Sequence, residues 1–138
     1  MNPQLPIQLR HLRLSGMAQA LPLRLEQARS GCLDPHEFLE LLVEDELARR
    51  ADRLFARRLK AAGIVQVKEL SDFDWSFNPK IPRAKLVHLA TAKFIPEHTD
   101  VLLIGPPGIG KSHAAVAIAV GAIRAGYRAL VKSTFDLA

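Results

Sequence analysis

The chain has 138 residues, 49% of them hydrophobic and 24% charged, with a formal net charge of +5. This composition is typical of a globular protein of one ordinary domain or two small ones. It excludes a transmembrane protein, because no apolar run could span a bilayer, and a disulfide-rich protein, because Cys32 is the only cysteine. The N-terminus lacks a secretory leader pattern, so we expect a cytoplasmic protein without a membrane partner, in which Cys32 fills space beside a turn.

Residues 4–30 have the apolar spacing of helices. Ser15 and Gly16 predict either a break or a second helix with Ser15 as its cap, and Pro22 predicts a kink or a restart. Gly31 is expected to end this segment.

A long helix is predicted from residue 35 to about residue 62. Asp34 and Glu37 have the spacing of a capping box around Pro35, and Gly63 ends the pattern. The helix is acidic early and arginine-rich late, which suits its macrodipole and a solvated face. The alternative is that the basic end contacts nucleic-acid phosphates. The candidate arginines are Arg49, Arg50, Arg53, Arg57 and Arg58.

Residues 64–81 form a connector that contains three aromatic residues within five positions, Phe73, Trp75 and Phe77. They could anchor the connector on the following domain, wall an adenine pocket, or do both. A short helix is predicted from residue 82 to residue 91.

The apolar run at residues 101–104 predicts a strand. The segment Gly105-Pro106-Pro107-Gly108-Ile109-Gly110-Lys111-Ser112 follows and fits the phosphate-binding loop G-x-x-x-x-G-K-[ST]. A helix at 110–125, a strand at 127–132 and a helix from Phe135 to Ala138, with Thr134 as its cap, complete the predicted order.

The loop's residue types favour triphosphate chemistry. Its glycines allow the amides to turn inward as a nest for phosphate oxygens, in front of a helix N-terminus. Lys111 is expected to reach the β- and γ-phosphates, and the Ser112 hydroxyl to ligate Mg²⁺. His113 opens the helix, where a packing role is favoured over catalysis. The alternative for the whole motif is a glycine-rich turn without a ligand. The predicted cofactor contacts are Gly105, Pro106, Pro107, Gly108, Ile109, Gly110, Lys111, Ser112 and His113.

Four segments together resemble the IstB-like ATP-binding proteins of the AAA+ superfamily, which are helper ATPases of insertion sequences. The segments are residues 12–18, 38–46, 73–79 and 105–113. The resemblance covers essentially the whole chain, and such proteins are also similar to DnaC-type helicase loaders. Two positions depart from the family pattern, with Ser112 in place of Thr and Ala114 in place of Leu.

The resemblance implies a helical N-terminal domain at residues 1–63, an aromatic linker at 64–81 and the first part of an α/β P-loop domain at 82–138. The sheet of this domain is expected to be an incomplete parallel sheet. The implied cofactors are ATP and Mg²⁺, and the implied partners are target DNA bound largely without sequence preference, a transposase and further copies of the protein. The three linker aromatics take the place of the segment near the adenine.

Members of this family continue well past residue 138, so we expect an N-terminal fragment. No Walker B acidic pair, sensor residue or arginine finger is found in the chain, and hydrolysis needs such groups. We therefore expect weak nucleotide binding without turnover. The alternatives are a helicase loader and a non-catalytic helical module that binds DNA or partner subunits. A small P-loop kinase is disfavoured by the long helical segment before the loop.

Overall fold

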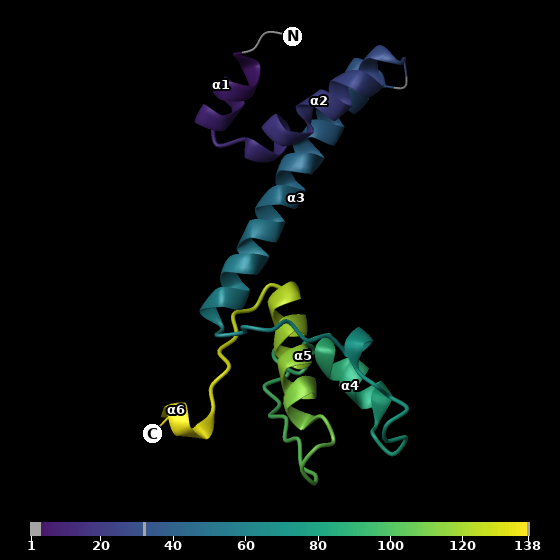
Figure 1. Ribbon diagram of the computed structural model, residues 1–138, viewed down its shortest axis with the longest axis vertical. Helices are drawn as coiled ribbons and strands as arrows, with labels where there is room; N and C mark the ends of the chain where they lie inside the picture. The colour runs from purple at the N-terminus through teal and green to yellow at the C-terminus, as the bar shows by residue number, and fades with distance from the viewer. Residues whose placement is uncertain (1–3, 32, 138) are drawn as a thin grey trace. The chain divides into compact units, whose positions relative to one another are not determined.

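A computed structural model describes residues 4–31 and 33–137, and within them all regular structure is helical (Figure 1). The chain divides into two compact units, Met1–Leu54 and Phe55–Ala138. The elements are α1 (Leu5–His11), α2 (Ser15–Arg29), α3 (Pro35–Ala61), the 3-10 helix η1 (Leu70–Asp72), α4 (Arg83–Ala90), α5 (Lys111–Arg124) and α6 (Thr134–Leu137).

The first unit contains the two helices expected at residues 4–30. The break before Ser15 is confirmed, but Ser15 as a cap is wrong, because Leu14 is the N-cap residue and Ser15 is the first residue of α2. The Ser15 hydroxyl is buried without a hydrogen-bond partner in the described part of the chain. Pro22 lies inside α2, which continues through it, so the predicted restart does not occur. Because proline has no N–H, the helix loses one backbone hydrogen bond there.

A carboxylate from another helix supplies the missing cap of α2. Glu46, on α3, accepts hydrogen bonds from the backbone N–H of Gly16 at 2.6 Å and of Met17 at 3.2 Å. A Cβ on Gly16 would lie 2.7 Å from the Cα of Glu46, so only glycine allows this approach. Arg50 donates to the second carboxylate oxygen at 2.8 Å and balances the charge of the buried Glu46.

The predicted start of α3 is confirmed. Oδ1 of Asp34 accepts from the N–H of His36 at 2.7 Å and of Glu37 at 2.9 Å, and the Glu37 carboxylate accepts from the N–H of Asp34 at 3.2 Å. This reciprocal arrangement is the capping box that the spacing indicated. The helix ends before Gly63, whose φ of +77° is a left-handed conformation, as the sequence suggested.

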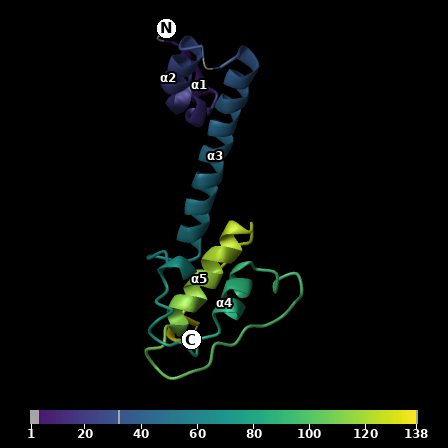
Figure 2. The same cartoon turned by 90° about the vertical axis from the view of Figure 1, so that its right-hand side faces the viewer.

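In the second unit, α4 packs against α5 and the linker covers the start of α5 (Figure 2). The shared core consists of Phe73, Leu86, Ala114 and Ile118. Half-buried apolar side chains surround these four: Leu70, Trp75, Ile81, Leu89, Phe94 and Leu103. The core therefore joins the linker, α4 and α5 around the first turns of α5.

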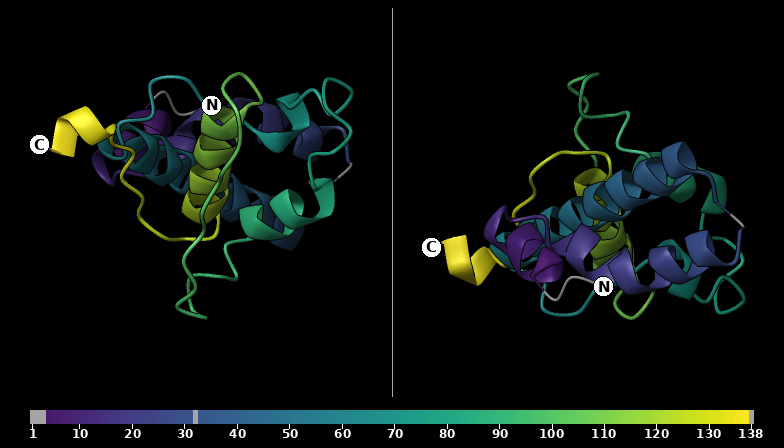
Figure 3. Two further views of the ribbon diagram at one scale, coloured as in Figure 1. Left: turned by 90° about the horizontal axis from the view of Figure 1, so that it is seen from below. Right: turned by 90° about the horizontal axis from the view of Figure 1, so that it is seen from above.

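The strands expected at residues 101–104 and 127–132 are not formed in the described residues, and Figure 3 accordingly draws no arrow for either segment. A strand requires a neighbour about 4.8 Å away to pair its backbone groups. The two segments do not pair with each other, and the N–H of Val131 instead donates to the carbonyl of Ala62 at 2.8 Å. The incomplete parallel sheet inferred from the sequence is therefore not observed.

Cys32 and Ala138 lie outside the described residues, so the predictions for these two residues stay untested. The last helix, α6, spans Thr134–Leu137, so Thr134 is its first residue and the prediction that Thr134 caps it is wrong. The Ser133 hydroxyl instead accepts from the N–H of Asp136 at 3.2 Å. None of the helices described is both long enough and apolar enough to cross a membrane.

Replacement of Glu46 by Gln is expected to destabilise the first unit. The substitution removes a charged acceptor from two amides and from Arg50, and hydrogen bonds to charged groups contribute about 1.5–3 kcal/mol each to stability. We expect the free energy of unfolding to fall by about 1.5–3 kcal/mol, which is the contribution of one such bond. Urea denaturation followed by circular dichroism measures it.

The matched control is Glu44→Gln, at an exposed position of the same helix, which should be nearly neutral.

Burial acts to raise the pKa of Glu46, but hydrogen bonds from Arg50, Met17 and Gly16 outweigh it and lower the pKa below the ordinary 4.5. The stabilisation is therefore present above pH 4.5 and is lost as the pH falls through the lowered pKa. Equal acid sensitivity in wild type and Glu46→Gln would contradict this assignment.

Candidate functional site

The phosphate-loop segment ends at a helix start formed by glycine. Gly110 is the N-cap residue of α5 with φ of +91°, and Gly108 has φ of +80°. Both are left-handed conformations that residues with a Cβ adopt at a cost. They turn the chain sharply into α5, so that residues 108–113 lie at the N-terminal end of the helix, where the helix dipole is positive.

The charged residue of the motif lies over its own loop. The Lys111 ammonium donates to the carbonyl oxygens of Gly105 at 2.8 Å and Pro106 at 2.6 Å. Lys111 is half-buried and Ser112 is exposed in the first turn of α5. One positive charge and one hydroxyl are thus presented at the same helix end.

The backbone amides at this end are available to a ligand. Within the part of the chain that the structure describes, the N–H groups of residues 108–113 donate to no backbone or side-chain acceptor, and the first such bond is from Ala114 to Gly110 at 2.9 Å. Unpaired amides at a helix N-terminus, beside a lysine, favour an anion with several oxygens. The residues present therefore fit a phosphate chain.

The linker is positioned against the loop by one aromatic ring. Phe73 is only 8% exposed, and a Cβ built on Gly110 would lie 2.9 and 3.0 Å from two of its ring carbons. The ring of Trp75 lies 4.6 Å from that of Phe73, and the guanidinium of Arg83 lies 5.2 Å from the Trp75 ring. Phe73 is thus the point at which the linker contacts the loop backbone.

His113 connects the first turn of α5 to the linker. Its ring meets that of Phe73 edge-on at 5.2 Å, and its Nε2 lies 3.0 Å from the carbonyl oxygen of Glu69. Because a carbonyl can only accept, Nε2 carries the proton and donates. The Glu69 carboxylate in turn accepts from Arg124, whose guanidinium lies 4.7 Å from the ring of Phe55. Glu69 therefore bonds to both ends of α5.

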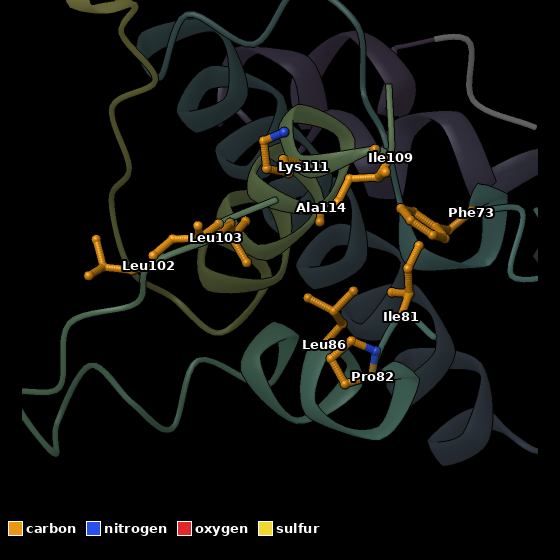
Figure 4. Close-up of a pocket in the computed structure, with 11 residues that line it drawn as sticks. Phe73, Ile81, Pro82, Leu86, Leu102, Leu103, Ile109, Lys111 and Ala114 are labelled. Carbon is orange, nitrogen blue, oxygen red and sulfur yellow. The ribbon is translucent and has the colours of Figure 1, made fainter. Parts of the chain in front are cut away.

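Two hollows flank the loop. One has a volume of about 190 Å³ and is mainly apolar. Figure 4 shows Phe73 and Ile81 on one side of it, Leu102 and Leu103 on the opposite side, and Leu86 of α4 between them. Ala114 of α5 also lines this space.

The second hollow, of about 250 Å³, lies between the linker and residues 108–113. It is lined by Phe73, Asp74, Phe77, Gly108, Ile109, Gly110 and His113. Phe77 is 70% exposed, whereas Trp75 lines neither hollow. Hydrogen bonds from the Ser76 hydroxyl and amide lower the pKa of Asp74, so a carboxylate borders this space. Of the three predicted aromatics, Phe77 has the most accessible ring.

The five predicted DNA-contacting arginines all lie on α3, but two are bonded within the fold. Arg50 bonds to Glu46, and Arg58 is half-buried and donates to the carbonyl of Gly126 at 2.9 Å. Arg49, Arg53 and Arg57 are exposed. Arg50 is exposed as well, so Arg58 is the half-buried one of the five arginines.

No cluster of three or more His, Cys, Asp or Glu side chains able to hold a metal is found among the described residues. A Mg²⁺ ion here would be held by the Ser112 hydroxyl together with phosphate oxygens.

Sequence reasoning did not find two of these features. Glu69 and Arg124 are separated by 55 positions, and nothing in the local pattern around either residue indicates their pairing. The contact between Phe73 and Gly110 was also missed, although the aromatic cluster in a connector was a usable signal.

The chain is similar in sequence to known ATP-binding proteins. The sequence profile of a family described as IstB-like ATP binding protein matches residues 7–138. A protein named as an insertion-sequence ATP-binding protein in Mycobacterium tuberculosis is 42% identical over 125 residues, 91% of this chain and 50% of the relative. One named for insertion sequence IS21 in Pseudomonas aeruginosa is 37% identical over 127 residues, 92% of this chain and 48% of the relative. The chain thus spans about half the length of these relatives.

Substitution of Gly110 by Ala is expected to cost more stability than substitution of Gly108 by Ala. Both positions have positive φ, which costs about 1–2 kcal/mol for a residue with a Cβ. At Gly110 the new methyl group would also overlap the Phe73 ring, whereas nothing lies within 4 Å at Gly108. Thermal unfolding of both variants compares them.

Phe73→Leu in the Gly110→Ala background should recover part of the extra loss, because it shortens the side chain that overlaps the new methyl group. Equal destabilisation by the two glycine substitutions would contradict the contact.

Proposed function

This chain belongs to the family of IstB-like ATP-binding proteins, and on this premise we propose that its phosphate loop binds ATP together with Mg²⁺. The observation that supports the proposal most directly is the set of unpaired amides at residues 108–113, beside the ammonium of Lys111. A triphosphate has the negative charge and the oxygen acceptors that this set of donors requires.

Each residue of the loop has a distinct task in this proposal. The amides and the positive end of the α5 dipole bind phosphate oxygens. The Lys111 ammonium, which donates to two loop carbonyl oxygens in the structure, donates to phosphate oxygens in their place. The Ser112 hydroxyl would hold the Mg²⁺ that accompanies the nucleotide. The metal would neutralise part of the charge of the phosphate chain.

The base side of the nucleotide is proposed to lie in the hollow between the linker and the loop. This space of about 250 Å³ adjoins Gly108 and Gly110, and the exposed ring of Phe77 gives it an aromatic wall. An aromatic face suits a purine base through stacking.

The cellular role that we propose is that of a helper ATPase in DNA transposition. The relatives are named as ATP-binding proteins of insertion sequences, which supports this role over that of a helicase loader. The proposed partners are target DNA, a transposase and further copies of the protein. A second candidate is a non-catalytic helical module, supported by the exposed Arg49, Arg53 and Arg57 on α3.

Mg²⁺·ATP is expected to bind to the wild-type chain, and Lys111→Ala is expected to weaken binding by at least about tenfold, because charged hydrogen bonds to phosphate are lost. Isothermal titration calorimetry measures both affinities. The proposal fails if wild type and Lys111→Ala bind ATP equally or if neither binds.

Lys85→Ala is a matched control for this comparison, because it removes an exposed lysine of α4 outside both hollows and should leave the affinity unchanged. Phosphate release is measured in parallel. The sequence predicts none for these 138 residues, and release that disappears in Lys111→Ala would overturn that prediction.

DNA binding is expected to depend on salt. If Arg53 and Arg57 contact phosphates, replacing both with Gln should lower the slope of log affinity against log salt by about 1 per arginine. Fluorescence anisotropy with duplex DNA at several salt concentrations gives the slope.

The control for this pair is Arg10→Gln, an exposed arginine on α1. A wild-type slope near zero, or an unchanged slope in the double variant, would count against phosphate contacts by α3.

A further inference from the structure

Phe73 borders the hollow proposed for the base, but other side chains cover most of its ring. Its side chain is 8% exposed, with Trp75 tilted against it at 4.6 Å and the edge of His113 at 5.2 Å. Base stacking needs an open aromatic face of the kind that Phe77 has at 70% exposure. Phe73 instead touches the backbone of the phosphate loop.

This contact falls on the residue that determines the direction of the amides. Gly110 is the N-cap of α5 and has φ of +91°. The ring carbons lie so near that no Cβ could be placed there without displacement, so the ring lies directly against the backbone at Gly110. A change in the position of the ring would therefore alter the backbone that carries the amides of residues 108–113.

Phe73 also contacts residues on the side away from the loop. Phe73 packs on Trp75, and Trp75 in turn lies under the guanidinium of Arg83 at the start of α4. Phe73 also borders both hollows beside the loop, so its ring has space into which it can move. A movement of Gly110 on phosphate binding would therefore move Phe73 and change the surroundings of Trp75.

We propose that Phe73 is a positioning residue of the phosphate loop, which holds Gly110 for phosphate binding and transmits the occupancy of the loop to the linker through Trp75. This inference rests on the proposed nucleotide binding. It assigns Phe73 to the phosphate end of the ligand and leaves the base side to Phe77.

Inorganic triphosphate with Mg²⁺ tests the assignment, because it fills the phosphate subsite and has no base. Affinities for Mg²⁺·triphosphate and Mg²⁺·ATP are measured for wild type, Phe73→Leu and Phe77→Ala. We expect Phe73→Leu to weaken both ligands by the same factor, about 3- to 30-fold. Phe77→Ala should weaken ATP more than triphosphate.

The matched control is Phe135→Leu, the same substitution at a 91% exposed ring on α6, which should change neither affinity. Leucine keeps most of the apolar volume at position 73, and circular dichroism melting without ligand checks that the variant is folded.

Trp75 provides a second readout in the wild-type chain, because it is the only tryptophan. Its emission should change when Mg²⁺·triphosphate binds, and this change should be reduced in Phe73→Leu at saturating ligand. A purely structural role for Phe73 would alter melting but not this response.

The outcomes separate the two proposals. If wild type binds both ligands and Phe73→Leu weakens only ATP, Phe73 is a base wall and the inference is overturned while the proposed function stands. The inference is also overturned if Phe73→Leu binds both ligands normally, or if Trp75 emission does not respond to triphosphate that calorimetry shows to be bound. If wild type binds neither ligand, both proposals fail.

Discussion

The packing of one phenylalanine ring against one glycine is the constraint on which the site depends. Gly110 must have no side chain for two reasons, its positive φ and the ring carbons of Phe73 that a Cβ would meet at 2.9 and 3.0 Å. The same ring belongs to the core that joins the linker to α4 and α5. The proposed positioning of the loop amides and the packing of the second unit therefore involve the same ring.

That contact matters more here because the second unit has no sheet in its described residues. Strands 101–104 and 127–132 were expected from their apolar runs, but a run alone provides no partner for its N–H and C=O groups. Leu102 and Ile104 are 83% and 88% exposed, whereas α5 buries Ala117, Val120 and Ile123. The loop is held from the helix side and the linker side, not by a strand leading into it.

The first unit shows how a distant residue can replace a local signal. The spacing around Ser15 indicated a cap, yet the cap of α2 is the carboxylate of Glu46, thirty residues away from Gly16. A carboxylate at a helix N-terminus satisfies two amides and interacts favourably with the dipole, which a serine hydroxyl does less well. The buried Ser15 hydroxyl without a partner is the cost of this arrangement among the described residues.

The sequence by itself determined the features that depend on neighbouring residues. Among these are the capping box at Asp34 and Glu37, the end of α3 at Gly63, the phosphate-loop motif and the four segments that together resemble the family. The residues of each such pattern lie close together in the chain, so the pattern can be recognised in the sequence without knowledge of the fold. Tertiary structure alone decided that Glu46 caps α2, that Arg58 bonds to Gly126, and that Phe73 lies behind the loop. These contacts join residues 30 or more positions apart, and only the folded chain brings them within bonding distance.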